Sequence, residues 1–394
     1  MKFTDFNFHE NLLEGIAASN YEDATPVQQQ VMPLVLQGKD IIASAQTGTG
    51  KTAAFLLPLI NRIITDHYDD HHISAMIIVP TRELAVQISE HLEGLSYFTS
   101  ISSIAVYGGG DGSSFVQEKQ ALSKGVDIVV CTPGKMIAHI NMGYVKIKSL
   151  KYLVLDEADR MLDMGFIDDI MRIINELPVK RQTLLFSATM PPKIRSLAQR
   201  ILQQPVEVNI ALSKPPEKIV QEAFVIFEEQ KMPLIKQLLK SKQFKSIIIF
   251  CSKKQQVKIL TRELKKAGIQ AEEIHSDLDQ SKREEVLRSF TSKRLPVLVA
   301  TDILSRGIDV DHIDLVVNFD VPHDGEDYVH RIGRTARAET DGTAYTFISP
   351  REQNKFAAIE NLLGKPVTKS KVPEELGPVP SYQPRTRRPQ SRRR

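Results

Sequence analysis

Short apolar runs separated by helical segments are the feature that most constrains the fold of this chain. Each run has the length of a buried strand and is followed by polar or glycine-containing residues. The runs lie at residues 41–43, 76–79, 104–107, 128–130, 152–155 and 183–186 in the first half, and at 246–250, 297–300, 315–317 and 345–348 in the second. This alternation predicts an α/β fold of parallel sheets covered by helices on both faces, with functional groups at the carboxyl ends of the strands.

The length of the chain and a break in its middle indicate two domains. Its 394 residues exceed the size at which one hydrophobic core usually stops growing. Paired prolines, Pro215 and Pro216, interrupt both helix and strand, so we expect a linker over residues 211–217. We therefore predict one domain over residues 1–210, a second over 218–363, and a tail over 364–394.

The positive charge of the chain is concentrated in this tail. The formal net charge is +3, but from Lys365 onward nine Lys and Arg residues stand against two Glu residues, which leaves a net negative charge for the preceding part. Six prolines and an Arg-rich end are typical of a segment that buries no core, so we expect a disordered basic tail. We favour an arm that binds nucleic acid through phosphate contacts over a solvated end that only aids solubility.

A phosphate-binding loop follows the first apolar run. It ends in Gly-Thr-Gly-Lys-Thr, where bare backbone amides can approach phosphate oxygens. Lys51 is expected to reach the β and γ phosphates of a bound nucleotide, and the hydroxyl of Thr52 to bind Mg²⁺. The predicted nucleotide contacts of this loop are Ala45, Gln46, Thr47, Gly48, Thr49, Gly50, Lys51 and Thr52, with Ala45 in place of the usual Gly.

Two charged clusters far apart in the chain complete a site for phosphoryl chemistry. Asp156 and Glu157 directly follow an apolar run, where a metal-binding acid is expected. Asp156 is predicted to bind Mg²⁺ through water, and Glu157 to orient or deprotonate the attacking water. Arg334 and Arg337 lie on one side of a helix or turn and can neutralise charge on the transferred phosphoryl group. Together with Lys51, these four residues are the predicted catalytic set.

These motifs resemble those of the DEAD-box RNA helicases, and the resemblance extends from about Phe3 to about Leu363. It implies two RecA-like domains in tandem, with ATP and Mg²⁺ as cofactors. It also implies RNA-stimulated ATP hydrolysis coupled to local, non-processive unwinding or remodelling of RNA duplexes and RNA–protein complexes. A finer similarity is to the compact bacterial members of the RhlE-like branch.

The resemblance assigns further residues around the nucleotide. Gln28 resembles the residue that reads the adenine edge, Tyr21 the aromatic residue that stacks on the ring, and Asp309 the ribose contact. The residues that it implies couple hydrolysis to strand separation are Asp159, Ser187, Thr189 and His330.

A third group of residues resembles the RNA-facing segments of the family. These are Pro80, Thr81, Arg82, Gly108, Gly109, Thr132, Pro133, Gly134 and Lys135 in the first domain, and Gln280, Arg283, Thr301 and Asp302 in the second. Their hydroxyls, backbone amides and few cations suit a sugar–phosphate backbone whose bases are not read. The resemblance implies single-stranded and short duplex RNA as ligands, and ribosomal or RNA-turnover proteins as partners.

The chain departs from the family pattern at four positions. Lys135 stands where the family usually has Arg. The other departures are Ser305 in place of Ala, Ala336 in place of Gly, and Asn20 in place of the Gly that commonly precedes the aromatic residue. Lys135 keeps its charge but lacks the planar guanidinium, so we expect one weaker phosphate contact. None of these departures removes a catalytic group.

Other functions stay open as alternatives. An ATP-gated RNA clamp shares every residue named above, so the sequence does not separate it from a helicase. A DNA-directed motor is disfavoured because nothing resembles a stepping or duplex-wedging domain. A metabolic P-loop kinase is disfavoured because no acceptor pocket is recognisable.

The remaining features predict a cytoplasmic protein, expected to be a monomer and to have no membrane contact. No segment approaches the roughly 18 apolar residues that a spanning helix needs, and Met1–Asp5 leads into no signal-peptide stretch.

Cys131 and Cys251 have no metal-ligand spacing and are expected to be buried. The His and Asp residues within 67–72 match no standard zinc site and are expected to form a solvated loop.

Overall fold

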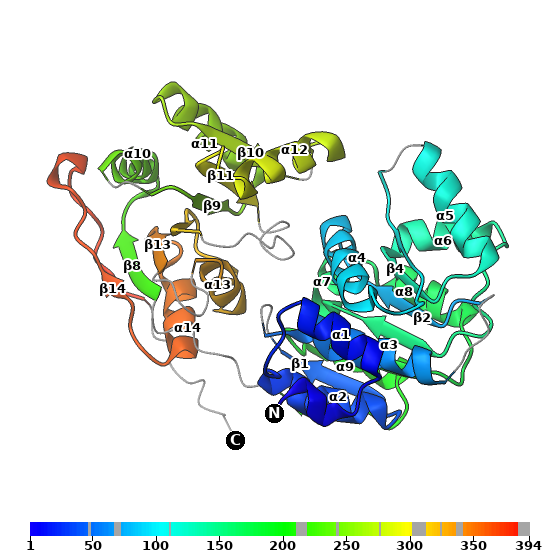
Figure 1. Cartoon of the computed structure of the whole chain (residues 1–394). Coiled ribbons are helices and arrows are strands. Elements are labelled where there is room, and N and C mark those ends of the chain that lie inside the picture. Colours follow the sequence, from blue (N-terminus) through cyan, green and yellow to red (C-terminus); the bar gives the residue numbers. More distant parts are fainter. Residues whose placement is uncertain are drawn as a thin grey trace, which may run out of the picture. The chain divides into compact units, whose positions relative to one another are not determined.

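The structure is a computed structural model (Figure 1) that describes residues 1–45, 49–66, 72–109, 112–209, 219–241, 244–275, 277–301, 313–323, 325–335 and 342–384. The chain divides into two compact units, Met1–Leu212 and Ser213–Arg394. Each unit is built on its own seven-stranded sheet. The predicted fold class of two RecA-like parallel-sheet domains is confirmed.

The first unit has the strand order β3-β4-β2-β5-β6-β1-β7, and every pairing between these strands is parallel. The strands are β1 (Ile41–Ser44), β2 (Ala75–Ile78), β3 (Ser103–Val106), β4 (Ile128–Cys131), β5 (Tyr152–Leu155), β6 (Gln182–Ser187) and β7 (Val206–Asn209). The helices are η1 (Phe3–Phe6), α1 (Glu10–Ala18), α2 (Pro26–Leu36), α3 (Lys51–Thr65), α4 (Arg82–Ser96), α5 (Gly112–Lys124), α6 (Pro133–Asn141), α7 (Ala158–Asp163), α8 (Ile167–Glu176) and α9 (Pro192–Ile201). Every apolar run predicted as a strand in this half forms one.

Both faces of this sheet are buried because side chains alternate between them along each strand. On one face, Ile41 and Val154 belong to a core that includes helices α1 to α4. On the other, Ile42 and Leu153 belong to a core that includes helices α5 to α9. The faces are thus occupied by packing, which leaves the carboxyl edge of the sheet for polar loops.

The second unit repeats this architecture with the strand order β10-β11-β9-β12-β13-β8-β14, again with parallel pairings. The strands are β8 (Ile219–Val225), β9 (Ile247–Cys251), β10 (Ala271–Ile274), β11 (Val297–Thr301), β12 (Leu315–Asn318), β13 (Gly342–Ile348) and β14 (Thr368–Lys369). The helices are η2 (Glu228–Gln230), α10 (Lys231–Ser241), α11 (Lys254–Lys266), α12 (Gln280–Thr291), α13 (Gly325–Ile332), α14 (Gln353–Leu363) and η4 (Glu374–Leu376).

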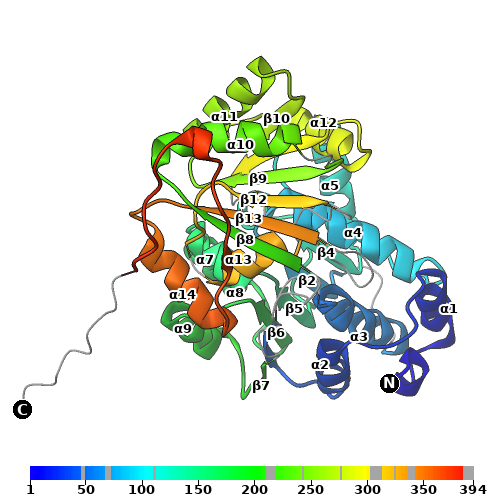
Figure 2. The same cartoon turned by 90° about the vertical axis from the view of Figure 1, so that its left-hand side faces the viewer.

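The tail begins later than the sequence predicted. Residues 367–384 pack along the second unit, where β14 pairs with β8 (Figure 2, red segment). Val367 is buried, and the hydroxyl of Tyr382 donates to Oε2 of Glu360 at 2.6 Å. The start of the tail at residue 364 is therefore corrected, because strand pairing, the buried Val367 and the hydrogen bond of Tyr382 fix this proline-rich stretch to the unit. Residues 385–394 lie outside the described residues.

Candidate functional site

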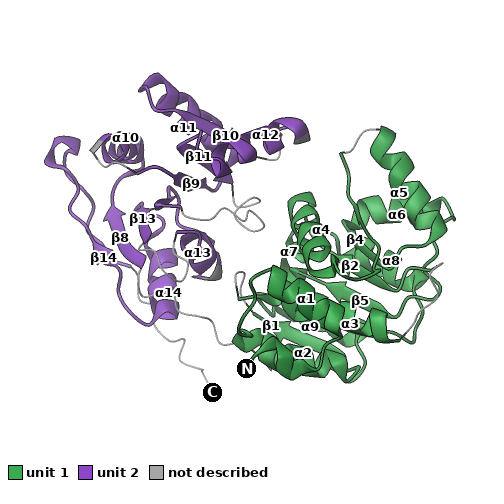
Figure 3. Cartoon of the chain, viewed as in Figure 1, with its two compact units in different colours: residues 1–212 green, residues 213–394 purple. Residues whose placement is uncertain are grey.

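Two groups of predicted site residues follow the carboxyl ends of the strands in the first unit, which is green in Figure 3. The neighbouring strands β1, β6 and β5 lead into the phosphate loop, the Ser187 segment and Asp156. The neighbouring strands β2, β4 and β3 lead into Thr81, Thr132 and Gly108. Because parallel strands end at the same edge of a sheet, the nucleotide residues and the RNA residues of this unit occupy two adjoining halves of one edge.

The phosphate loop leads from β1 into α3 through Gly50. This residue precedes the helix with φ +90°, a left-handed conformation that residues with a Cβ rarely adopt. A Cβ at Gly50 would also lie 2.5 Å from Nε2 of Gln28. Lys51 is thereby placed in the first turn of α3, where unpaired backbone amides attract anions. Residues 46–48 lie outside the described residues, and Ala45 is buried.

Gln28 ties the segment before β1 to the phosphate loop. Its buried side chain accepts a hydrogen bond at Oε1 from the amide of Thr25 at 2.8 Å and donates from Nε2 to the carbonyl of Gly50 at 3.1 Å. A carboxamide has a second N–H and a second lone pair, so two groups are left for an adenine. The adenine contact of Gln28 stays a prediction. The structure adds a second role, in which Gln28 links Thr25 to Gly50 of the phosphate loop.

Tyr21, the residue predicted to stack on the adenine ring, packs on the core of the first unit. Its ring lies edge-on to Phe3, with the ring centroids 5.8 Å apart. The preceding Asn20 has φ +56°, in the left-handed region that Gly favours and Asn tolerates. This backbone conformation explains why Asn is accepted where the family commonly has Gly.

Lys51 and Asp156 form the buried charged centre of the nucleotide half. The Nζ of Lys51 is buried and has no hydrogen-bond acceptor within the part of the chain that the structure describes. Burial raises the pKa of Asp156 to about 6, and Glu157 adds to the rise although Lys51 opposes it. A buried ammonium without an acceptor fits a phosphate oxygen, and a carboxylate destabilised by burial fits a divalent cation.

Glu157 is held by its backbone and by an ion pair. Its φ is +51°, a left-handed conformation that costs a residue with a Cβ about 1 kcal/mol or more. Its Oε2 accepts a hydrogen bond from Nη1 of Arg160 at 3.1 Å, and both side chains are buried. Arg160 was not predicted from the sequence, although its spacing of three residues from Glu157 in a helix is a usable signal. Arg160 fixes the carboxylate that is predicted to handle water.

The three predicted coupling residues of the first unit are hydrogen-bonded to one another. Oδ2 of Asp159 accepts from the amide of Thr189 at 3.0 Å. Oγ of Ser187 accepts from the amide of Asp159 at 3.2 Å and donates to the carbonyl of Thr189 at 2.7 Å. These bonds join the start of α7 to the segment after β6, so a displacement of one segment acts on the other.

In the RNA half of the edge, Arg82 lies over the two glycines that follow β3. Gly109 has φ +91°, and a Cβ there would lie 1.9 Å from Nη1 of Arg82. A Cβ at Gly108 would lie 3.2 Å from Nη2. Thr81 caps the N-terminus of α4, where its Oγ1 accepts a hydrogen bond from the amide of Leu84 at 3.3 Å. The structure thus brings together side chains and backbone that the sequence could only group by resemblance.

The segment after β4 begins α6 at Pro133. Gly134 is exposed, and a Cβ there would meet nothing within 4 Å, so this position leaves room for a ligand. Nζ of Lys135 lies 2.9 Å from Oε2 of Glu118 in α5. Glu118 was not predicted from the sequence, because a single acid on a helix gives no local signal.

The described site residues of the second unit lie around β11, α12 and α13. Thr301 ends β11 and is buried, and Arg283 in α12 is half-buried. His330 in α13 is buried, and Arg334 directly after α13 is half-buried. Outside the described residues lie Asp302, Asp309 and Arg337, as does the side chain of Gln280.

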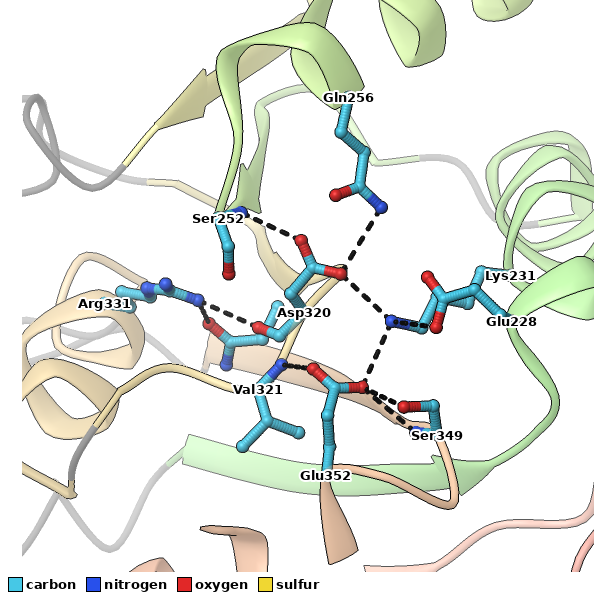
Figure 4. Close-up of polar contacts among 10 residues, drawn as sticks. Glu228, Lys231, Ser252, Gln256, Asp320, Val321, Arg331, Ser349 and Glu352 are labelled. Carbon is cyan, nitrogen blue, oxygen red and sulfur yellow. Dashed lines mark hydrogen bonds and ion pairs between the residues drawn. The ribbon is translucent and has the colours of Figure 1, made fainter.

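A buried polar network holds α13 in place (Figure 4). Nζ of Lys231 lies 3.0 Å from Oδ1 of Asp320 and 3.2 Å from Oε2 of Glu352. Nη1 of Arg331 donates to the carbonyl of Asp320 at 3.1 Å and to Oδ1 of Asn318 at 2.9 Å. The network therefore connects α10 and the end of β12 to the helix that carries the predicted coupling histidine.

Arg331 is a residue of this helix for which the sequence predicted no role. It is fully buried, and its guanidinium lies 5.2 Å from the ring centroid of Phe250. Its neighbour His330 was predicted to act in coupling and Arg334 in catalysis. Residues one apart on a helix point in different directions, so Arg331 and His330 are both buried but point toward different parts of the unit.

Some features of the described residues bear on other functions. No helix among them is both long and apolar enough to cross a membrane. Cys131 and Cys251 are buried, as predicted, and burial raises the pKa of Cys131. Within the same residues no group of three or more His, Cys, Asp or Glu is arranged to hold a metal ion. Residues 67–71 of the His and Asp cluster lie outside them.

The two sheets and the phosphate loop define a P-loop nucleoside triphosphatase. Residues 25–197 match the family model of the DEAD/DEAH box helicases, and residues 230–339 match that of the helicase conserved C-terminal domain. The ATP-dependent RNA helicase CshA of Listeria monocytogenes is 44% identical over 365 residues, which cover 92% of this chain and 69% of that protein. The DEAD-box ATP-dependent RNA helicase CshA of Bacillus subtilis is 42% identical over 372 residues, with coverages of 94% and 74%.

A solved structure of S. cerevisiae Dbp5 bound to RNA and ADP BeF3 is similar over 93% of this chain and 95% of that chain, with a TM-score of 0.83 and 30% identity. The chain belongs to the DEAD-box ATP-dependent RNA helicases. It is an enzyme whose RNA-dependent ATP hydrolysis drives local, non-processive unwinding or remodelling of RNA. Both of these bacterial relatives carry the name CshA, and the finer placement in the RhlE-like branch stays a prediction.

Proposed function

We propose that ATP binds at the half of the first sheet edge formed by β1, β6 and β5. The observation that carries this proposal is the buried Nζ of Lys51, which lacks an acceptor among the described residues and lies near enough to Asp156 to oppose the rise in pKa that burial causes. The backbone amides of residues 49–52 would bind phosphate oxygens, as at other helix N-termini after a phosphate loop. Gln28 would use its remaining N–H and lone pair on the adenine, and Tyr21 would stack on the ring.

Mg²⁺ would be held by the hydroxyl of Thr52 and, through water, by Asp156. The raised pKa of Asp156 supports this assignment, because a dication stabilises the carboxylate that burial destabilises. When bound, Mg²⁺ neutralises charge on the phosphates. Glu157, held by Arg160, would orient the attacking water or accept its proton.

The RNA backbone would bind along the other half of the edge. Arg82 over Gly108 and Gly109 offers a cation beside bare backbone, and Thr132 offers a hydroxyl. The second unit would extend this contact through Gln280, Arg283, Thr301 and Asp302. Groups of these kinds bind phosphate and sugar, so we propose single-stranded RNA and short duplexes as ligands with little dependence on base sequence.

The second unit would complete catalysis when ATP and RNA are both bound. Arg334 and Arg337 would then neutralise charge on the transferred phosphoryl group, an effect worth about 10³ to 10⁵ in rate in other phosphoryl-transfer enzymes. Asp309 would contact the ribose. The network of Lys231, Asp320 and Arg331 supports this proposal because it fixes the helix directly before Arg334.

The release of phosphate, measured with and without single-stranded RNA, tests this assignment of roles. We expect RNA to accelerate hydrolysis, and Glu157→Gln to slow it by about 10² or more while ATP-dependent RNA binding persists. Equal rates with and without RNA would contradict the proposal.

An RNA clamp and a DNA motor are separated by two further measurements. A protein–RNA complex that decays much more slowly than a strand is released from a short duplex would favour a clamp. Stimulation by DNA equal to that by RNA would favour a DNA motor.

A cytoplasmic location and a monomeric state are also proposed, as expected from the sequence, and ribosomal or RNA-turnover partners are proposed on the family resemblance. Crosslinking of the protein to cellular RNA, followed by sequencing, identifies the RNA and with it the pathway. Sedimentation of the purified chain reports its oligomeric state.

A further inference from the structure

Glu118 of α5 holds Lys135, one of the predicted RNA contacts. Oε2 of Glu118 lies 2.9 Å from Nζ of Lys135 and 3.0 Å from Nε2 of His139, both in α6. Only 7% of the Glu118 side chain and 18% of the Lys135 side chain are exposed. Salt in the solvent therefore screens this ion pair much less than a surface pair.

The hydrogen bonds of His139 determine which residue balances the charge of Glu118. A carboxylate only accepts, so Nε2 of His139 donates to Glu118, while Nδ1 faces the hydroxyl of Tyr144. Burial lowers the pKa of His139 even though Glu118 opposes this change, and burial raises the pKa of Tyr144. At neutral pH the ring is therefore neutral and its Nδ1 accepts from Tyr144. The cation that balances Glu118 is Lys135.

An aromatic ring of α5 also helps to fix the position of Lys135. Phe115 stacks on His139, with the ring centroids 5.1 Å apart and an interplanar angle of 17°. Nζ of Lys135 lies 5.3 Å from the centroid of the same Phe115 ring. Lys135 is thus held by a carboxylate and a ring of α5 while it sits in the first turn of α6.

We propose that Glu118 sets the strength of RNA binding by keeping the charge of Lys135 from the RNA phosphates. The inference rests on the proposed RNA contact of residues 132–135. Moving Lys135 from Glu118 to a phosphate would leave a buried carboxylate without its cation, which is an unfavourable exchange. The segment therefore contacts RNA through the hydroxyl of Thr132 and through backbone groups.

This arrangement suits an enzyme that releases its strand after each hydrolysis. Each cation that neutralises a phosphate tightens binding and releases a counterion. A lysine already neutralised by Glu118 adds neither effect. The first unit then binds RNA less tightly than its number of cations suggests. Strand release is therefore faster than it would be if Lys135 neutralised a phosphate.

A purely structural Glu118, which only joins α5 to α6 through His139, predicts a different salt dependence. Each phosphate neutralised on a single strand changes the slope of log K against log salt concentration by about 0.7. A structural carboxylate changes the stability of the first unit and leaves this slope unchanged. The two roles are therefore distinguished by RNA titrations at several salt concentrations.

The test uses the full chain, saturating AMP-PNP and a fluorescein-labelled single-stranded oligouridylate between 50 and 200 mM KCl. Glu118→Gln can still accept from His139 through its amide oxygen, but it no longer holds Lys135 by charge. We expect a slope steeper by about 0.7 and binding about fivefold tighter at 0.1 M salt. Glu93→Gln, at an exposed acid in α4, makes the same change in net charge and should leave the slope unchanged.

Lys135→Gln in the otherwise unchanged chain tests the same idea without replacing Glu118. We expect an unchanged slope, because Lys135 neutralises no phosphate while Glu118 holds it. A slope shallower by about 0.7 would overturn the inference, as would an unchanged slope in Glu118→Gln with normal thermal unfolding. If Glu118→Gln does not fold, the slope of Lys135→Gln decides, read with normal thermal unfolding because this variant leaves the buried Glu118 without its cation. Failure of RNA to stimulate hydrolysis by the wild-type chain would instead contradict the proposed function.

Discussion

The carboxylate of Asp159 accepts a hydrogen bond from the amide of Thr189, with Oδ2 and N 3.0 Å apart. Asp159 follows the acid pair that is proposed to handle Mg²⁺ and water, and Thr189 follows β6. The hydroxyl of Ser187 joins the same two residues, as acceptor from one and donor to the other. The acid pair and the segment that leads into α9 are therefore mechanically linked within the first unit.

Ser187→Ala should separate ATP hydrolysis from RNA unwinding. The substitution removes one buried and one partly buried hydrogen bond of about 1 kcal/mol each, while Asp156 and Glu157 keep their own contacts. We expect RNA-stimulated hydrolysis within about threefold of wild type and duplex unwinding slower by about tenfold or more. Phosphate release and strand displacement from a labelled duplex measure the two rates. Ser96→Ala, which removes a buried hydroxyl bonded within α4, is the control and should change neither.

Asp156→Asn should alter how stability depends on pH in the metal-free protein. The pKa of Asp156 is about 6 in the folded chain against an ordinary value of 3.8, so the folded state binds more protons than the unfolded state between these values. Stability therefore falls as pH rises through this interval, by up to about 3 kcal/mol from this group. Urea unfolding between pH 4 and 7 should show that the free energy of unfolding of Asp156→Asn increases relative to that of wild type as pH rises. A constant difference between the two proteins would refute the buried, ionising carboxylate.

Gly109→Ala should weaken RNA binding without disturbing ATP binding. The new Cβ would lie 1.9 Å from Nη1 of Arg82, so the guanidinium must move away from the backbone of the two glycines. Loss of one phosphate contact corresponds to about fivefold weaker binding at 0.1 M salt and a slope shallower by about 0.7. Fluorescence titrations with RNA and with a labelled ATP analogue measure both affinities.

The matched control for this substitution is Gly38→Ala. Gly38 also has a left-handed φ, of +75°, and a Cβ there would meet nothing within 4 Å, so the same backbone strain is introduced without a clash. We expect RNA binding like that of wild type. Equal losses in the two variants would mean that Arg82 is not the group displaced.

The central strands were predictable from sequence, and several outer ones were not. Strands such as β5 and β9 are buried on both faces and read as uninterrupted apolar runs. The edge strand β10 contains Glu272 and Glu273, and the edge strand β7 alternates Val with Glu and Asn. Strand β14 has two residues and pairs only through its backbone with β8. Exposure at an edge weakens the apolar pattern on which such a prediction depends, although the edge strand β3 keeps enough of it to have been predicted.

The same distinction holds for the candidate site. Lys51 and Asp156 were predictable because each belongs to a short motif that follows an apolar run in the sequence. Glu118 and Arg331 act through partners that lie 17 residues away at Lys135 and 13 away at Asn318, and each is ordinary in its local sequence. The residues that only the structure reveals are therefore the ones that hold or restrain the predicted groups.

Removal of residues 385–394 should weaken RNA binding without loss of stability. The deleted segment holds six arginines and lies beyond the residues that pack on the second unit. We expect the slope of log K against log salt concentration for single-stranded RNA to become shallower by about 0.7 or more. Hydrolysis at saturating RNA should be nearly unchanged. Replacement of the six arginines by Gln at full length is the control for chain length and should give the same result. An unchanged slope in both variants would refute an RNA-binding arm.

A longer truncation, after Gly364, should also destabilise the second unit. It removes the pairing of β14 with β8, the buried Val367 and the ring of Tyr382, which packs 6.4 Å from Phe356 between ring centroids. Loss of two such apolar side chains corresponds to about 3 kcal/mol or more. Thermal unfolding should therefore show a lower transition for this variant, whereas the truncation after Pro384 should unfold like wild type. Identical unfolding of the two truncated proteins would mean that residues 365–384 contribute no stability, and the loss of RNA affinity could then be attributed to charge in both.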